Sequence, residues 1–153
     1  MRCNSFPTMA VDISGGPYNG YIYVAWTNIG VPGTNTGTNV SVYCMRSTNG
    51  GVSWGTPVKV NQGTSSSNYA SFFPWLSCDP ETGKLFCVFY DDHELGSTST
   101  ACETWVGYSE DGGASWGDFQ VSDVSFTPAA IPGLASGYMG DYLGIAARGN
   151  HVY

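Results

Sequence analysis

The chain has 153 residues, of which 42% are hydrophobic and 11% are charged, and its formal net charge is -7. So few charged residues exclude coiled coils and helical bundles, and the hydrophobic content argues against a disordered chain. Five lysine and arginine residues provide no basic surface for nucleic acid. The longest apolar runs, Tyr21–Trp26 and Leu85–Tyr90, have six residues each, whereas a membrane-spanning helix needs about 20. We therefore expect a folded protein with no membrane span and no nucleic-acid partner.

Short runs rich in β-branched and aromatic residues recur along the chain, separated by Gly, Asn, Asp and Pro, and no segment has a sustained helical period. The predicted strands, in chain order, are Pro7–Val11, Tyr21–Thr27, Val40–Arg46, Val58–Asn61, Pro74–Cys78, Lys84–Asp91, Glu103–Ser109, Phe119–Ser122, Leu143–Ala147 and His151–Tyr153. Segments 12–20 and 79–83 are predicted turns, because each is dense in Gly and Pro and joins two apolar runs. The sequence thus predicts an all-β protein.

Several of these blocks repeat in the same order. Ser47–Trp54 matches Ser109–Trp116, which lies 62 residues later in the chain. The apolar segments upstream of the two copies also match each other, as do Phe6–Asp12 and Phe73–Asp79 before them. Each repeat holds four predicted strands with local connections, and a four-stranded unit of this kind is stable only when stacked on neighbours, as propeller blades are.

The repeats divide the chain into a first blade over 5–62, a second over 71–123 and the start of a further blade over 140–153. A closed propeller needs about four to eight blades. We therefore expect one propeller domain whose remaining blades come from the same longer chain or from other subunits.

The five cysteines contain no CxxC pair, which argues against a zinc site. Two alternatives stay open for them. Some could form disulfides in an oxidising compartment, and Cys87 and Cys102 are the first candidate pair. Alternatively, all of them are small buried hydrophobic residues.

The pattern Ser-x-Asp-x-Gly-x-Ser-Trp of Ser109–Trp116 resembles the Asp-box, also called the bacterial neuraminidase repeat. The first copy, Ser47–Trp54, has Asn49 where the aspartate is expected. Two copies at blade spacing make the resemblance specific, and it covers the chain from about Ser5 to Tyr153. It implies a sialidase-like β-propeller, of which this chain would supply about two and a half four-stranded antiparallel blades.

We expect both boxes to build turns and not a reactive site. Asp111 can accept hydrogen bonds from the backbone amides of its own turn, and Asn49 can still accept one such bond. Glycines permit the positive φ of a tight reversal, and Trp116 is expected to pack back over its blade. The residues assigned this structural role are Ser47, Asn49, Gly51, Trp54, Ser109, Asp111, Gly113 and Trp116.

Strand order places the boxes on one face of the ring, because each lies between a third and a fourth strand. The loops between second and third strands, and the links between blades, lie on the other face. The resemblance implies that sialidase-like propellers carry their active site on that other face. The segments there are 28–39, 62–72, the loop that begins at Asp91, and 123–142. Loop aromatic residues that could stack on sugar rings are Tyr18, Tyr69, Phe72, Phe73 and Tyr138.

The densest ionisable cluster is Asp91-Asp92-His93-Glu94. The carboxylates of Asp91, Asp92 and Glu94 could bind Ca²⁺, or one of them could keep a raised pKa and act as an acid. A solvated acidic loop is the alternative.

Asp141 and Tyr142 enter the predicted innermost strand of the third unit, so their side chains could reach the central channel; a capping turn with a packed tyrosine is the alternative. The ligand-binding candidates are thus Asp91, Asp92, His93, Asp141 and Tyr142.

Sialidases resemble one another in clasping a sugar carboxylate with three arginines and in using a tyrosine nucleophile, a glutamate partner and an aspartate acid/base. This sequence has only Arg2, Arg46 and Arg148 and lacks the family's Arg-Ile-Pro signature, so no catalytic residue is assigned. We expect a secreted or cell-surface, non-catalytic module that binds glycans or extracellular proteins or serves as a scaffold, with Ca²⁺ as the candidate cofactor. The alternative is a sialidase-type glycoside hydrolase whose catalytic residues lie partly outside this chain.

Overall fold

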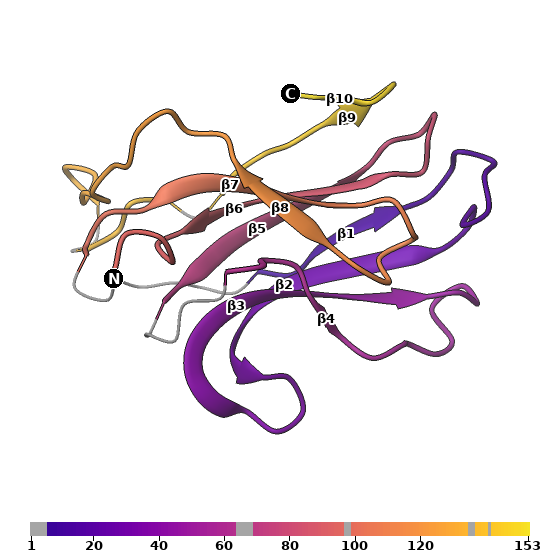
Figure 1. The fold of residues 1–153 in the computed structure, drawn as a ribbon, viewed down its shortest axis with the longest axis horizontal. Coiled ribbons are helices and arrows are strands. Elements are labelled where there is room, and N and C mark those ends of the chain that lie inside the picture. Colours follow the sequence, from indigo (N-terminus) through magenta and orange to yellow (C-terminus); the bar gives the residue numbers. More distant parts are fainter. Residues whose placement is uncertain (1–5, 64–68, 97–98, 135–136, 141) are drawn as a thin grey trace.

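The computed structural model describes residues 6–63, 69–96, 99–134, 137–140 and 142–153, and its regular elements are all β-strands (Figure 1). The first sheet has the order β1 (Thr8–Val11), β2 (Ile22–Val31), β3 (Thr36–Ser47) and β4 (Val58–Lys59). The second sheet has the order β5 (Ser71–Cys78), β6 (Leu85–Asp91), β7 (Glu103–Ser109) and β8 (Gly117–Gln120). A short hairpin pairs β9 (Ala147–Arg148) with β10 (His151–Val152). The all-β prediction is confirmed, and the described residues contain no helix that could cross a membrane.

Within each four-stranded sheet, all neighbouring strands are antiparallel and consecutive in the chain. Side chains therefore alternate between the two faces of each sheet. In β2, Tyr23 and Ala25 are fully buried, whereas the residues on either side of them are only partly buried. In β6, it is Leu85, Cys87 and Phe89 that are fully buried.

These two buried sets face each other and form one core between the sheets. The first sheet contributes Tyr23, Ala25, Val42, Cys44 and the following Val60, and the second sheet contributes Leu76, Leu85, Cys87, Phe89, Trp105 and Trp116. The two sheets approach closely at Gly107, where an added Cβ would lie 2.5 Å from Cγ1 of Val60 and 3.5 Å from Cε3 of Trp116. The second sheet therefore stacks on the first, as neighbouring blades of a propeller do.

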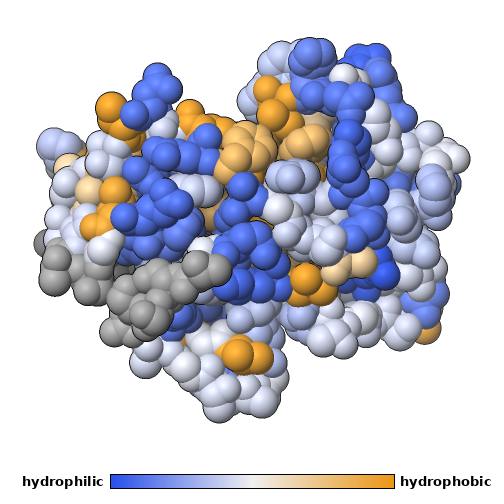
Figure 2. Space-filling model, viewed as in Figure 1, coloured by the Kyte–Doolittle hydropathy of each residue, from blue (hydrophilic) through white to orange (hydrophobic). Residues whose placement is uncertain are grey.

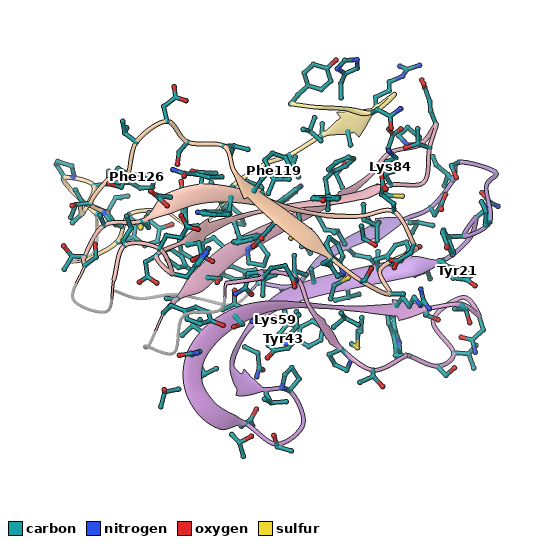
Figure 3. The ribbon with its side chains drawn as sticks, in the orientation of Figure 1. Tyr21, Tyr43, Lys59, Lys84, Phe119 and Phe126 are labelled. Carbon is teal, nitrogen blue, oxygen red and sulfur yellow. The ribbon has the colours of Figure 1, made fainter. Side chains whose placement is uncertain are left out.

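The connections divide between two ends of the sheets. At the end that we call the turn end lie the β1–β2 and β5–β6 turns and both box turns, which join β3 to β4 and β7 to β8. At the opposite end, the loop end, lie the β2–β3 and β6–β7 connections and the links that leave β4 and β8. In Figure 3, Tyr21 and Lys84 mark the turn end and Phe126 marks the loop end. This division is the one that the sequence predicts.

Polar contacts at the turn end tie successive units together. Arg46 of the first sheet donates from Nη1 to the carbonyl oxygen of Gly112 at 2.6 Å and to that of Asp111 at 3.3 Å. Asp79 of the second sheet accepts hydrogen bonds from the backbone amides of Gly149 at 3.1 Å and Asn150 at 2.8 Å, which belong to the β9–β10 turn. Each unit thus holds the turn of the next one.

The structure differs from the predicted strands in two main places. The β2–β3 hairpin extends to Val31 and resumes at Thr36, so most of segment 28–39 is paired strand and not open loop. A register shift between Ile29 and Val31, with Gly30 at a φ of 72°, lets this hairpin continue beyond the predicted strands. Of the predicted strand Leu143–Ala147, only Ala147 is in a strand.

The proposed Cys87–Cys102 disulfide is wrong. Cys87 pairs with Gly107, five residues beyond Cys102 along the same stretch of chain, so a rise of about 3.3 Å per residue separates the two cysteines by about 16 Å. Both are buried thiols, in different clusters of the core. The alternative, small buried hydrophobic residues, holds for Cys44, Cys87 and Cys102.

The close approach at Gly107 gives a test of the stacked arrangement. We expect Gly107→Ala to lower the free energy of unfolding by about 1–3 kcal/mol, because its Cβ forces Val60 out of a packed core. Gly144→Ala is the matched control, since nothing lies within 4 Å of a Cβ added there. Chemical denaturation of both variants measures the difference, and equal stability would contradict the close contact between the sheets.

Candidate functional site

The predicted structural role of the second box agrees with its hydrogen bonds. Oδ1 of Asp111 accepts from the amides of Ala114 and Ser115, both at 2.9 Å, and from Oγ of Ser109 at 2.8 Å. Oδ2 accepts from Oγ of Ser115 at 2.5 Å, and Oγ of Ser109 accepts from the amide of Gly113 at 2.9 Å. Gly113 has a φ of 77°, as the tight turn requires. All these bonds stay within the turn.

The first box forms the same kind of turn with an amide in place of the carboxylate. Oδ1 of Asn49 accepts from the amide of Ser53 at 2.9 Å and from Oγ of Ser47 at 3.0 Å, and Oγ of Ser47 accepts from the amide of Gly51 at 2.9 Å. The turn therefore forms with asparagine at position 49. The two tryptophans differ, however: Trp116 is buried in the core, whereas Trp54 is 39% exposed.

At the loop end, Asp91 is the last residue of β6 and is completely buried. Its Oδ2 accepts from Oγ of Ser71 at 2.5 Å, and its Oδ1 accepts from the backbone amide of His93 at 2.6 Å and lies 2.5 Å from Nδ1 of the same residue. Burial raises the pKa of Asp91, and the hydrogen bonds from Ser71 and His93 oppose that rise. This carboxyl group is engaged on both oxygens and has no access to a ligand.

The His93 side chain is largely enclosed. It is 8% exposed, its ring centroid lies 4.7 Å from that of Trp105, and Tyr69 meets it edge-on at 6.4 Å. The backbone of Gly63 passes so close that an added Cβ there would lie 2.6 Å from Cγ of His93. The Asp91–His93 pair therefore fastens the link between the two sheets to the end of β6.

Asp92 lies on the other side of the strand end. Its Oδ1 accepts from the backbone amide of Ala70 at 2.7 Å, and the half-buried side chain lines a cavity of about 450 Å³. Strand alternation in the sequence predicts this difference, although the sequence analysis grouped the two residues together. Asp91 continues the buried alternation of Leu85, Cys87 and Phe89, so the side chain of Asp92 faces the opposite way.

The cavity beside Asp92 is built from the loop-end segments that the sequence singles out. Its lining includes Ala70 from the first link, Phe72 from the start of β5, residues 99–102 from the β6–β7 connection, and residues 127–130, 137 and 139 from the second link. Phe72 and Cys102 also belong to a small apolar cluster with Tyr90, Phe126 and Met139, which gives the cavity an apolar floor. Among its described lining residues, Asp92 is the one that carries a charge.

A second cavity of about 370 Å³ lies beside the β2–β3 hairpin. Here Nζ of Lys59 and Oγ of Ser41 lie 3.3 Å and 3.4 Å from the hydroxyl oxygen of Tyr69. Burial alone would raise the pKa of Tyr69, but its hydrogen bonds with Ser41 and Lys59 lower it. Figure 3 shows Lys59 next to Tyr43, its partner across β3 and β4. The spacing of Ser41, Lys59 and Tyr69 in the sequence does not predict this group, because the three residues come from β3, β4 and the first link.

The predicted calcium ligands do not converge. The carboxylates of Asp91 and Asp92 have different hydrogen-bond partners, and Oε1 of Glu94 lies 3.6 Å from Nε2 of His93. Within the part of the chain that the structure describes, no group of three His, Cys, Asp or Glu side chains is placed to hold a metal ion.

Tyr142 is 70% exposed and stacks on Phe6 with 5.9 Å between ring centroids. It lies ahead of β9 and not within an innermost strand, and with Phe73 and Pro74 it lines a small cavity of about 110 Å³. Asp141, its predicted neighbour in the site, lies outside the described residues. The two described arginines make contacts within the fold: Arg46 binds the second box, and Arg148 donates to Oε1 of Glu81 at 2.8 Å.

Known proteins resemble this chain in fold. No protein-family model and no curated protein sequence matches it. Among solved structures it is similar to the Hadza microbial sialidase Hz136, with a TM-score of 0.56 and 14% sequence identity over 74% of this chain. The match spans 25% of the sialidase chain. The chain therefore has a sialidase-like fold and forms part of a β-propeller, as its sequence predicts.

The box carboxylate gives a second prediction. Hydrogen bonds from Ser115, Ser109 and Ala114 outweigh the effect of burial and hold the pKa of Asp111 at about 2, below its ordinary 3.8. Asp111 therefore stabilises the fold above about pH 4, and this contribution is lost as the pH falls through about 2. We expect Asp111→Ala to lower the free energy of unfolding by about 2 kcal/mol at pH 7 and to weaken its acid dependence.

Asp111→Asn should cost less than Asp111→Ala at pH 7, because Asn49 builds the equivalent turn with an amide. Asp123→Ala is the control for a change of charge, since Asp123 is exposed. Urea denaturation between pH 2.5 and 7 measures all four proteins, and an unchanged acid dependence in Asp111→Ala would contradict the assignment.

Proposed function

We propose that this chain is part of a secreted or cell-surface propeller that binds glycans at its loop end without cleaving them. The observation that carries the proposal is the cavity beside Asp92, where one half-buried carboxylate faces a space with an apolar floor. A carboxylate oxygen accepts hydrogen bonds from sugar hydroxyls, and an apolar floor suits the C–H face of a sugar ring. The volume of about 450 Å³ is within the range of small-molecule sites.

The non-catalytic part of the proposal is supported by the chemistry of the neighbouring residues. A general acid or base must come within hydrogen-bond reach of its substrate. Asp91 has no exposed surface and both of its oxygens are engaged, and the His93 ring is enclosed by Trp105, Tyr69 and Gly63. Asp91 and His93 of the densest ionisable cluster thus serve the fold, and Asp92 is the charged group among the described residues that line the cavity.

Glycan binding is tested on the full chain with a glycan array and by titration of the best binder. We expect Asp92→Asn to weaken binding at least tenfold, since it removes the charge but keeps an acceptor for the amide of Ala70. Asp123→Asn is the matched control, because it makes the same change at an exposed position. No binder on the array, or equal binding by Asp92→Asn, would contradict the proposed site; binding of extracellular proteins or a scaffold role would then remain.

The alternative is a sialidase-type glycoside hydrolase with catalytic residues partly outside this chain, and the fold likeness to a sialidase is what favours it. We expect the chain to release no fluorophore from a fluorogenic sialoside, because its described arginines are engaged in structural contacts. Turnover that is lost in Asp92→Asn and kept in Asp123→Asn would establish the hydrolase instead.

A further inference from the structure

The carboxylate of Asp92 has no positively charged partner among the described residues. Its Oδ1 accepts a hydrogen bond from the backbone amide of Ala70 at 2.7 Å, and no described residue donates to its Oδ2. A half-buried charge in such a position is costly unless a counterion or several donors compensate it. One carboxylate oxygen is therefore left for a group that enters the cavity.

The backbone around Asp92 holds this carboxylate in place. Ala70 forms a parallel bridge with Val40 of β3, and the amide of Val40 donates to the carbonyl oxygen of Tyr69 at 3.0 Å. The carbonyl oxygen of Asp92 accepts from the amide of Leu95 at 3.0 Å, which closes a turn directly after β6. A carboxylate that is held before its ligand arrives loses little freedom on binding, so the cavity is preorganised for a polar group of the ligand.

The positive charges of the described residues are engaged elsewhere. Arg46, Lys84 and Arg148 make their polar contacts at the turn end. Nζ of Lys59 donates to a backbone carbonyl oxygen of the first link at 3.3 Å. The chain as a whole has a formal net charge of -7, so its electrostatic field attracts positively charged ligands. We therefore expect the group that meets Asp92 to be a cation.

The rest of the lining indicates the kind of cation. Ca²⁺ takes about six to eight oxygen ligands, whereas Asp92 is the one carboxylate among the described lining residues. The floor of Phe72, Cys102 and Met139 is apolar. Hydroxyl side chains that line the same cavity are Ser99, Thr100 and Thr127. At the loop end, on the left of Figure 2, hydrophobic residues lie between hydrophilic ones in the same way. An organic cation with an apolar face and hydroxyl groups therefore fits this lining better than a metal ion.

We propose that the Asp92 cavity binds amino sugars whose amine is free and protonated. The ammonium group binds Oδ2 of Asp92, and the C–H face of the sugar ring lies over Phe72 and Met139. A neutral sugar would cover the carboxylate and return only ordinary hydrogen bonds, whereas an ammonium group returns charge-assisted ones. The inference rests on the proposed function, because it names the sugar that the glycan site takes.

The test compares a chitosan oligosaccharide, made of glucosamine, with a chitin oligosaccharide of equal length, made of N-acetylglucosamine. Both are titrated into the full chain at mildly acidic pH, where the free amine is protonated, and calorimetry gives the two dissociation constants. We expect the chitosan oligosaccharide to bind at least about tenfold more tightly. Asp92→Asn should remove this preference, whereas Asp123→Asn, the matched change at an exposed position, should keep it. Thermal unfolding checks that both variants fold.

The ratio of the two dissociation constants separates this inference from the proposed function. Equal or tighter binding of the chitin oligosaccharide, or a preference that persists in Asp92→Asn, would overturn the amino-sugar inference and leave glycan binding in place. No binding of the chitosan oligosaccharide would overturn it as well, and an empty glycan array would overturn the proposed function too. Binding of poly-lysine without binding of the chitosan oligosaccharide would assign the cavity to a cationic protein segment instead. Deprotonation of the amine at high pH should abolish the preference in the unsubstituted chain, and a preference that survives there would contradict the role of charge.

Discussion

The stacking of the second sheet on the first is the contact on which the rest of the structure depends. Gly107 leaves room for Val60 of the first sheet and for the ring of Trp116, and this fit fixes the distance between the sheets. Arg46 fixes the turn ends relative to each other, because it binds backbone carbonyl oxygens of the second box. Because the distance between the sheets and the position of their turn ends are both fixed, the link that leaves β4 meets the end of β6. Ala70, Asp92 and His93 come together there.

The two ends of the sheets use acidic residues in opposite ways. At the turn end, Asp79 and Asp111 accept several backbone amides, and these hydrogen bonds hold the pKa of each at about 2 in spite of burial. At the loop end, burial raises the pKa of Asp91 because the carboxyl group sits in the core. A pKa that is lowered by hydrogen bonds from the backbone amides of turns indicates a structural group. A raised pKa often indicates chemistry, but here the surrounding side chains leave a substrate no way in.

Much of the fold was predictable from the sequence because it depends on local patterns. Alternating apolar residues located most of the strands to within a few residues, and the repeated Gly-Gly-x-Ser-Trp segments gave their order and the two ends of the sheets. The length of the β2–β3 hairpin was not predictable in the same way, because polar residues such as Asn28 and Thr36 pair there without an apolar pattern. The predicted Cys87–Cys102 disulfide was wrong because the sequence places the two cysteines near neighbouring strands but does not give the register of those strands.

The site was only partly predictable, because two adjacent aspartates, Asp91 and Asp92, have different surroundings. Asp91 and Asp92 are neighbours of the same chemical type, yet strand alternation sends one carboxylate into the core and the other towards a cavity. The cavity itself is made by residues of the second sheet, its β6–β7 connection and the two links, which are separated along the chain and meet only in the folded protein. A similar fold does not identify the residues of the site, because propellers that share an architecture differ in the side chains at their loops. What this chain does therefore depends on which of its few polar loop-end groups remain accessible, and among the described residues around the larger cavity the charged one is Asp92.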